Sequence, residues 1–169
     1  MLSNDLEIAD CSDWRQILNS IIIIGTDPPC PRCQLLRNVV TKKIDELGLK
    51  ATIQHFSYTT EEAKAIAKRH GLISGTAKDV AKLLNEHINT QDLSNVIETF
   101  IPNKTSDFFP YNNCKWSIEL DNLLRKYENK AKDLGIMMTP VLIINDVIKH
   151  QGSVPEMSKI NKWLLELKC

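Results

Sequence analysis

Apolar residues form two short continuous runs along this chain, at residues 21–24 and 141–144. Turn-forming residues follow each run, so we expect two buried strands that are covered on both faces. Residues 51–57 contain β-forming side chains and predict a third strand. Residues 147–151 predict a fourth strand, which would return antiparallel to the second run after a two-residue turn at residues 145–146.

The segments between these strands have the apolar spacing of amphipathic helices. Residues 34–47 end before Gly48 and predict a helix that joins two parallel strands by a right-handed crossover. A short helix or lead-in is expected at residues 13–19, and a capping box of Ser153 and Glu156 is expected to open the last helix. The middle of the chain predicts four further helices, at residues 59–71, 76–84, 93–100 and 120–134.

Residues 102–116 connect two of these helices and contain two prolines and four aromatic side chains. Because so long a connection is rarely structureless, we expect it to be packed or functional. Its aromatic residues either cover a site as a lid or substrate platform, or pack this segment onto the core; they are Phe108, Phe109, Tyr111 and Trp116.

Acidic and basic residues are balanced, with 21 of each, so the charge gives no reason to expect a nucleic acid or an anionic membrane as partner. No apolar run approaches the roughly 20 residues that cross a bilayer, and residues 1–13 lack the apolar core of a signal peptide. We therefore expect a cytoplasmic protein that does not bind membranes. The five cysteines do not form the dense, regular framework of a small secreted domain; they are Cys11, Cys30, Cys33, Cys114 and Cys169.

Two of these cysteines, Cys30 and Cys33, stand where the first buried strand gives way to the helix that follows it. Three positions apart, they lie on one helical face and can close and reopen a small disulfide ring. The helix amino terminus and the positive charge of Arg32 both stabilise a thiolate at Cys30, and Pro31 fits the first helical turn, where its missing N–H costs nothing. We expect Cys30 to be the nucleophile and Cys33 the resolving thiol of thiol–disulfide exchange.

A C-x-x-C motif alone also fits half of a zinc site. This sequence has no second C-x-x-C and no close histidine pair, and Thr139-Pro140 precedes the second apolar run, so the redox interpretation is favoured. The main alternative is a soft-metal-binding module, in which the two thiolates hold zinc, copper, arsenic or mercury with Cys114 or a histidine nearby. A third interpretation is a partner-binding domain without catalytic turnover.

The motif and its surroundings resemble the thioredoxin-like superfamily. The resemblance covers approximately residues 1–57 and 135–169, and the Cys30-Pro31-Arg32-Cys33 motif is similar to the C-P-x-C of glutaredoxins. It implies an α/β thioredoxin-like fold with a mixed central sheet, and a cis peptide bond that places Pro140 against the disulfide. It also implies that the backbone of Thr139 pairs with an extended substrate segment. We expect Pro31 and Arg32 to contribute to the same substrate site.

The resemblance makes residues 58–138 a helical insertion between the two parts of the thioredoxin-like domain, residues 1–57 and 139–169. This placement is similar to that in periplasmic disulfide oxidases of the superfamily. Compact redox-active disulfide proteins of archaea and bacteria are similar in the core, but they lack such an insertion.

Two positions and one turn segment depart from the patterns of the family. Pro29 and Ile24 stand where thioredoxins carry a Trp and a buried Asp, so a thioredoxin-type proton relay is not expected. Residues 151–154 match half of the turn with which glutaredoxins bind the glutathione carboxylate.

The sequence therefore predicts a thiol–disulfide oxidoreductase that acts on protein or small-molecule disulfides, with no metal or other cofactor. A flavoprotein reductase or a small thiol would restore the dithiol. Cys114 is expected to be a packed cysteine, with a role as a third redox thiol as the alternative. The histidines lie in separate predicted elements and are expected to be solvated or hydrogen-bonded; they are His55, His70, His87 and His150.

Overall fold

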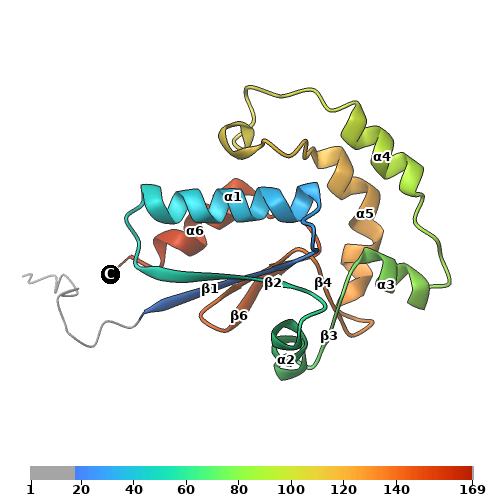
Figure 1. Cartoon of the computed structure of the whole chain (residues 1–169), viewed down its shortest axis with the longest axis horizontal. Coiled ribbons are helices and arrows are strands. Elements are labelled where there is room, and N and C mark those ends of the chain that lie inside the picture. Colours follow the sequence, from blue (N-terminus) through green and yellow to red (C-terminus); the bar gives the residue numbers. More distant parts are fainter. Residues whose placement is uncertain (1–17, 169) are drawn as a thin grey trace, which may run out of the picture.

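A computed structural model describes residues 18–168 and shows a mixed α/β fold with a four-stranded central sheet (Figure 1). The strand order is β2-β1-β5-β6. β1 is parallel to β2 and antiparallel to β5, and β5 is antiparallel to β6, so the predicted mixed sheet is confirmed. The strands are β1 (Asn19–Gly25), β2 (Ala51–Ser57), β5 (Val141–Ile144) and β6 (Val147–Gln151).

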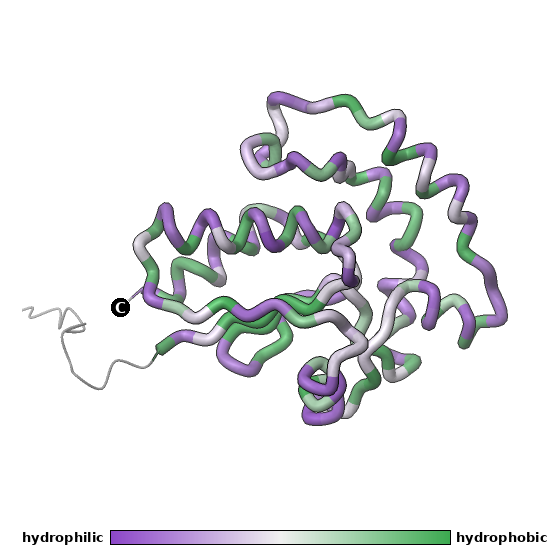
Figure 2. Tube along the Cα trace, in the orientation of Figure 1, coloured by the Kyte–Doolittle hydropathy of each residue, from purple (hydrophilic) through white to green (hydrophobic). Residues whose placement is uncertain are grey.

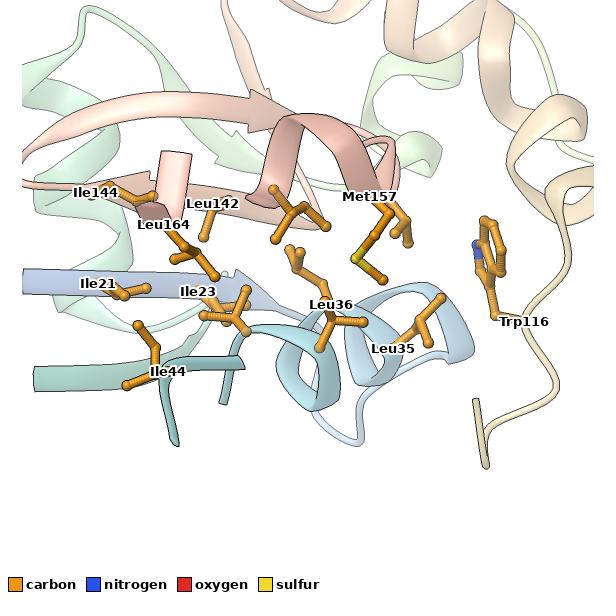
Figure 3. Close-up of a cluster of buried hydrophobic side chains, with 14 of the residues drawn as sticks. Ile21, Ile23, Leu35, Leu36, Ile44, Trp116, Leu142, Ile144, Met157 and Leu164 are labelled. Atoms are coloured by element: carbon orange, nitrogen blue, oxygen red, sulfur yellow. The ribbon is translucent and has the colours of Figure 1, made fainter. Parts of the chain in front are cut away.

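Helices cover both faces of this sheet, which explains the uninterrupted isoleucine run in β1. Helices α1 (Pro31–Glu46) and α6 (Met157–Leu165) lie on one face, and α2 (Glu61–Arg69) lies on the other (Figure 1). Ile21 and Ile23 pack in the cluster formed with α1 and α6, whereas Ile24 packs in the cluster formed with α2. Figure 3 shows the first of these clusters, in which side chains of β1, β5, α1 and α6 meet.

The chain between β2 and β5 is mainly helical, as expected, but it also contains two short strands. β3 and β4 pair in parallel as a separate two-stranded sheet. A distinct apolar cluster joins Val80 and Ala81 to Leu124, Tyr127 and Met138. After α2, the elements of this segment are β3 (Ile73–Gly75), α3 (Ala77–Leu83), α4 (Thr90–Glu98), η1 (Phe109–Tyr111), α5 (Ile118–Ala131) and β4 (Ile136–Met138).

The aromatic connection before α5 packs onto the core. Trp116 is only 6% exposed and belongs to the cluster under α1 and α6, beside Leu35 and Met157 (Figure 3). Phe108 packs edge-on against Trp116 with ring centroids 5.0 Å apart. The packing interpretation therefore holds for these two side chains, whereas Phe109 is 42% exposed.

The predicted hairpin turn between β5 and β6 is confirmed, since Asn145 and Asp146 have φ of 48° and 66°, as a type I′ turn requires. The predicted capping box of the last helix is wrong. Glu156 is the N-cap of α6, and Ser153 is buried and donates instead to Glu128, with 2.7 Å between their oxygens. Ser153 thus serves a tertiary contact, which a local pattern could not reveal.

The expected lead-in at residues 13–19 falls largely outside the described residues, as do Cys11 and Cys169. Asn19, at its end, already belongs to β1. Figure 2 shows the apolar residues concentrated along the central strands, with polar and apolar positions mixed along the helices. Among the helices of residues 18–168, none combines the length and apolarity needed to cross a lipid bilayer.

Candidate active site at the start of helix α1

The two motif cysteines meet at the amino terminus of α1. Cys30 is the N-cap residue with an extended backbone, and Pro31 is the first residue of the helix. The sulfur atoms of Cys30 and Cys33 are 3.2 Å apart, and both cysteines are free thiols. The backbone N–H of Cys33 donates to the Cys30 sulfur, with 3.5 Å between N and Sγ. This is the arrangement that a reversible disulfide needs.

The pKa of Cys30 is lowered from 9.0 to about 6. The largest cause is the hydrogen bond from the Cys33 thiol, which stabilises the thiolate; burial opposes it. The backbone N–H of Cys33, the positive charge of Arg32 and the hydroxyl of Thr26 lower the pKa further. Cys30 is therefore largely a thiolate at neutral pH, which fits the role of nucleophile that its position predicts.

Cys33 has the opposite character. It is 1% exposed, and its pKa is raised well above 9.0, first by its hydrogen bond to Cys30 and then by burial and the negative charge of Cys30. It stays a neutral thiol that donates to the Cys30 thiolate. Such a buried partner suits a resolving thiol, which acts after the more accessible Cys30 sulfur has reacted.

Thr26 and Gly25 shape the loop that holds the cysteines. The N–H of Cys30 donates to Thr26 Oγ1 at 2.9 Å, and the Thr26 hydroxyl donates to the carbonyl of Pro28 at 3.0 Å. A Cβ at Gly25 would lie 2.9 Å from Cys33 Cβ and 3.1 Å from its sulfur, so only glycine fits under Cys33. The sequence carries no signal that assigns either residue to the site, although Gly25 ends β1 and Thr26 follows it directly.

Arg32, which we expect to contribute to the substrate site, is buried against other parts of the chain. Its side chain is 5% exposed, with Nε donating to Asp121 Oδ1 at 2.5 Å and Nη2 donating to the carbonyl of Gly152. Asp121 is fully buried, and its other oxygen accepts from the Trp116 indole N–H at 3.0 Å and from the Val154 N–H at 3.2 Å. Arg32 therefore anchors the motif to α5 and to the loop after β6, and its charge still favours the Cys30 thiolate.

The peptide bond between Thr139 and Pro140 is cis, as the resemblance implied. The resemblance implied that the Thr139 backbone pairs with a substrate strand. In this structure the Thr139 N–H already donates to the carbonyl of Gly75 in β3 at 3.0 Å. Thr139 is 3% exposed and Pro140 is also buried. The Pro140 carbonyl accepts from the Gly152 N–H at 2.9 Å, so the same loop contacts both Arg32 and the cis-proline segment.

A cavity of about 200 Å³ opens beside the motif, at the carboxyl ends of β1 and β2. Cys33, Thr26, Asp27, Arg37 and His55 contribute to its walls. The pKa of His55 is lowered, first by burial and then by the charge of Arg37, so this imidazole is neutral at pH 7. Arg37 and His55 also line an adjoining groove of about 570 Å³ that continues along α1 towards η1.

Cys114 lies near the motif without forming a metal site. Its sulfur is 3.4 Å from the carbonyl oxygen of Pro31, and burial raises the pKa of its thiol. Within residues 18–168, no group of three or more histidine, cysteine, aspartate or glutamate side chains is placed to hold a metal ion. The described part of the chain thus supplies two closely spaced thiols and no complete ligand set.

Comparison with known proteins gives one match. A family model described as a thioredoxin domain matches residues 111–165, from η1 to the end of α6. This stretch includes the cis-proline segment and the β5–β6 hairpin but not the two motif cysteines. No curated protein and no solved structure matches the chain.

Proposed function

We propose that this chain, which matches a thioredoxin-domain family model over residues 111–165, is a thiol–disulfide oxidoreductase of the thioredoxin-like superfamily that acts through Cys30 and Cys33. The observation that carries the proposal is the pair of sulfurs 3.2 Å apart, one with a lowered and the other with a raised pKa. A half-buried thiolate beside a fully buried neutral thiol is a starting state from which exchange can proceed.

The reaction proceeds in two exchange steps. The Cys30 thiolate attacks one sulfur of the substrate disulfide, a mixed disulfide forms, and the other half of the substrate leaves as a thiolate. Cys33 then loses its proton and attacks the Cys30 sulfur, which closes the Cys30–Cys33 disulfide and releases the second half. The substrate gains two electrons and the dithiol loses two. The proton that leaves Cys33 ends on one released thiolate, and the other released thiolate takes its proton from water.

The protein contributes to both steps through fixed geometry. Thr26 holds the Cys30 backbone, and the hydrogen bonds from Cys33 and its N–H stabilise the thiolate before attack. Once Cys30 has become part of a mixed disulfide, its negative charge is gone. The charge that raises the pKa of Cys33 is thereby removed, so Cys33 ionises more readily when it is needed. A flavoprotein reductase or a small thiol in a reducing compartment would restore the dithiol.

Replacing Cys33 with Ala tests this assignment. The variant should accumulate a covalent adduct on Cys30 when mixed with a disulfide, because no second thiol releases it. Cys30→Ala should form no adduct, and Cys114→Ala should behave like the unaltered protein. Intact-mass measurement after quenching with acid detects the adduct in all three variants. Full disulfide turnover by both the Cys30 and the Cys33 variants would refute the roles of nucleophile and resolving thiol.

Soft-metal binding remains the second candidate, because the two thiols alone could hold a two-coordinate ion such as copper(I). The absence of a third ligand in the described residues favours exchange over a stable zinc site. Metal analysis of protein purified under reducing conditions separates the two functions. Stoichiometric metal that blocks alkylation of both thiols would support the binding module.

A further inference from the structure

The edge at which a peptide substrate would pair is already occupied in this structure. β3 runs parallel to β4, and the pairing continues to the Thr139 N–H, which donates to the carbonyl of Gly75. Thr139 is 3% exposed, so its backbone is not available to an added strand. An extended peptide would have to displace β3, whereas a small disulfide needs no such pairing.

The cavity beside the cysteines has unpaired charges of both signs. Arg37 lies one helical turn beyond Cys33, on the same face of α1, and is half-buried. Asp27 lies in the loop before Cys30, and both residues line the cavity. Within residues 18–168, neither side chain has a hydrogen bond or an ion pair.

An unpaired guanidinium in a partly buried wall is a binding group without a ligand. It matches a carboxylate, because its N–H groups donate in a fixed, planar arrangement. An exposed carboxylate such as that of Asp27 matches an ammonium group. The neutral His55 and the hydroxyl of Thr26 add polar groups without adding charge. These groups together fit an α-amino acid, which carries one charge of each sign.

We propose that the disulfide substrate is a small amino-acid disulfide, whose α-carboxylate binds Arg37 and whose α-ammonium group binds Asp27. This inference rests on the proposed function. The cavity, at about 200 Å³, receives one half of the substrate, and the sulfur of that half lies towards Cys33 in the wall. The Cys30 sulfur, which attacks, is 3.2 Å from the Cys33 sulfur. The electron flow is that of the two exchange steps, with the dithiol as reductant.

The test is the rate at which the pre-reduced protein is oxidised by defined disulfides, followed by intact mass in single-turnover experiments. Cystine carries both charged groups, whereas hydroxyethyl disulfide carries neither and reports the exchange chemistry alone. The binding variants are Arg37→Gln and Asp27→Asn. The matched control is Lys159→Gln, which removes an exposed positive charge on α6.

We expect Arg37→Gln to slow oxidation by cystine about tenfold, or about 1.4 kcal/mol, because the variant loses the charge-assisted hydrogen bonds to the carboxylate. Asp27→Asn should also slow oxidation by cystine. The rate at which hydroxyethyl disulfide oxidises either variant should stay within about twofold of the rate for the unaltered protein. Lys159→Gln should change neither rate.

Other results overturn the inference in distinguishable ways. Cystine rates that do not depend on Arg37, with normal oxidation by hydroxyethyl disulfide, would reject the amino-acid site and leave the exchange function intact. A disulfide-linked extended peptide that reacts faster than cystine, independently of Arg37, would instead indicate a protein substrate. Failure of every disulfide to oxidise the dithiol would reject the proposed function, and the substrate assignment with it.

Discussion

At the scale of single residues, the reactivity of Cys30 depends on neighbours that are not themselves reactive. The thiol of Cys33 supplies the hydrogen bond that lowers its pKa most, and Thr26 fixes its backbone. Gly25 permits this arrangement, because any side chain there would meet Cys33. The pKa of the nucleophile is therefore sensitive to the position of the last residue of β1.

Gly25→Ala should disturb both stability and reactivity. Its methyl group would lie 2.9 Å from Cys33 Cβ, so the backbone must shift, at a cost of about 1–3 kcal/mol of unfolding free energy. We expect the pKa of Cys30 to rise towards 9.0 as the sulfurs separate. Urea unfolding and the pH dependence of alkylation measure the two effects.

Gly48→Ala is the matched control for this substitution. Gly48 has a φ of 61° and no neighbour near a Cβ, so its replacement should cost about 1 kcal/mol in backbone strain and leave the pKa of Cys30 unchanged. Equal pKa values of Cys30 in the Gly25 variant and the unaltered protein would show that the close packing at β1 does not tune the thiolate.

At the scale of elements, a buried ion pair joins the motif to the chain between β2 and β5. Arg32 in α1 pairs with the fully buried Asp121 in α5, and Asp121 also accepts hydrogen bonds from Trp116 and Val154. α5 lies beside the amino-terminal end of α1 (Figure 1). The chain between β2 and β5 therefore does more than extend the fold, because its helix α5 fixes Arg32, the residue directly before Cys33.

Asp121→Asn should destabilise the protein by about 3 kcal/mol, because breaking a buried pair leaves the Arg32 charge without its partner. Glu61→Gln breaks the exposed pair with Lys64 and should cost less than about 0.5 kcal/mol. Urea unfolding of the reduced proteins compares them. Equal losses of unfolding free energy in the Asp121 and Glu61 variants would contradict an anchoring role for Asp121.

The elements also show what local patterns can predict. The isoleucine run of β1 and the turn at Asn145 were predictable because their signals are confined to a few adjacent residues. β3 and β4 were missed because strands of three residues give no periodicity. The buried position of Arg32 could not be predicted, because its partner Asp121 is 89 residues away and only the folded chain brings them together.

At the scale of the whole molecule, the loop after β6 connects helix α1, helix α5 and the cis-proline segment. Gly152 contacts Arg32 and Pro140, and Ser153 donates to Glu128 in α5. Burial alone would raise the pKa of Glu128. Hydrogen bonds from His150 and Ser153 and the charge of Arg125 outweigh burial and lower the pKa to about 2. The ionised Glu128 therefore stabilises the folded molecule.

This contribution predicts a defined loss of stability in acid. Because the folded pKa of Glu128 lies below its ordinary value of 4.5, the contribution is complete above pH 4.5 and is lost as the pH falls from 4.5 towards 2. Glu128→Gln should be less stable near pH 6, and the difference from the unaltered protein should shrink over this range. Glu119→Gln, at an exposed position of the same helix, is the control.

Urea unfolding between pH 2 and pH 6 makes this comparison. A difference between the Glu128 variant and the unaltered protein that stays constant over that range would contradict the role of the buried carboxylate.

The most direct test of the account is the pH dependence of Cys30 alkylation in the reduced protein, measured with iodoacetamide and resolved by residue with peptide mass spectrometry. The rate should rise with pH around a midpoint near 6, while Cys33 remains unreactive at neutral pH. A midpoint for Cys30 near the ordinary thiol value of 9.0 would contradict the claim that this fold holds a thiolate ready for exchange.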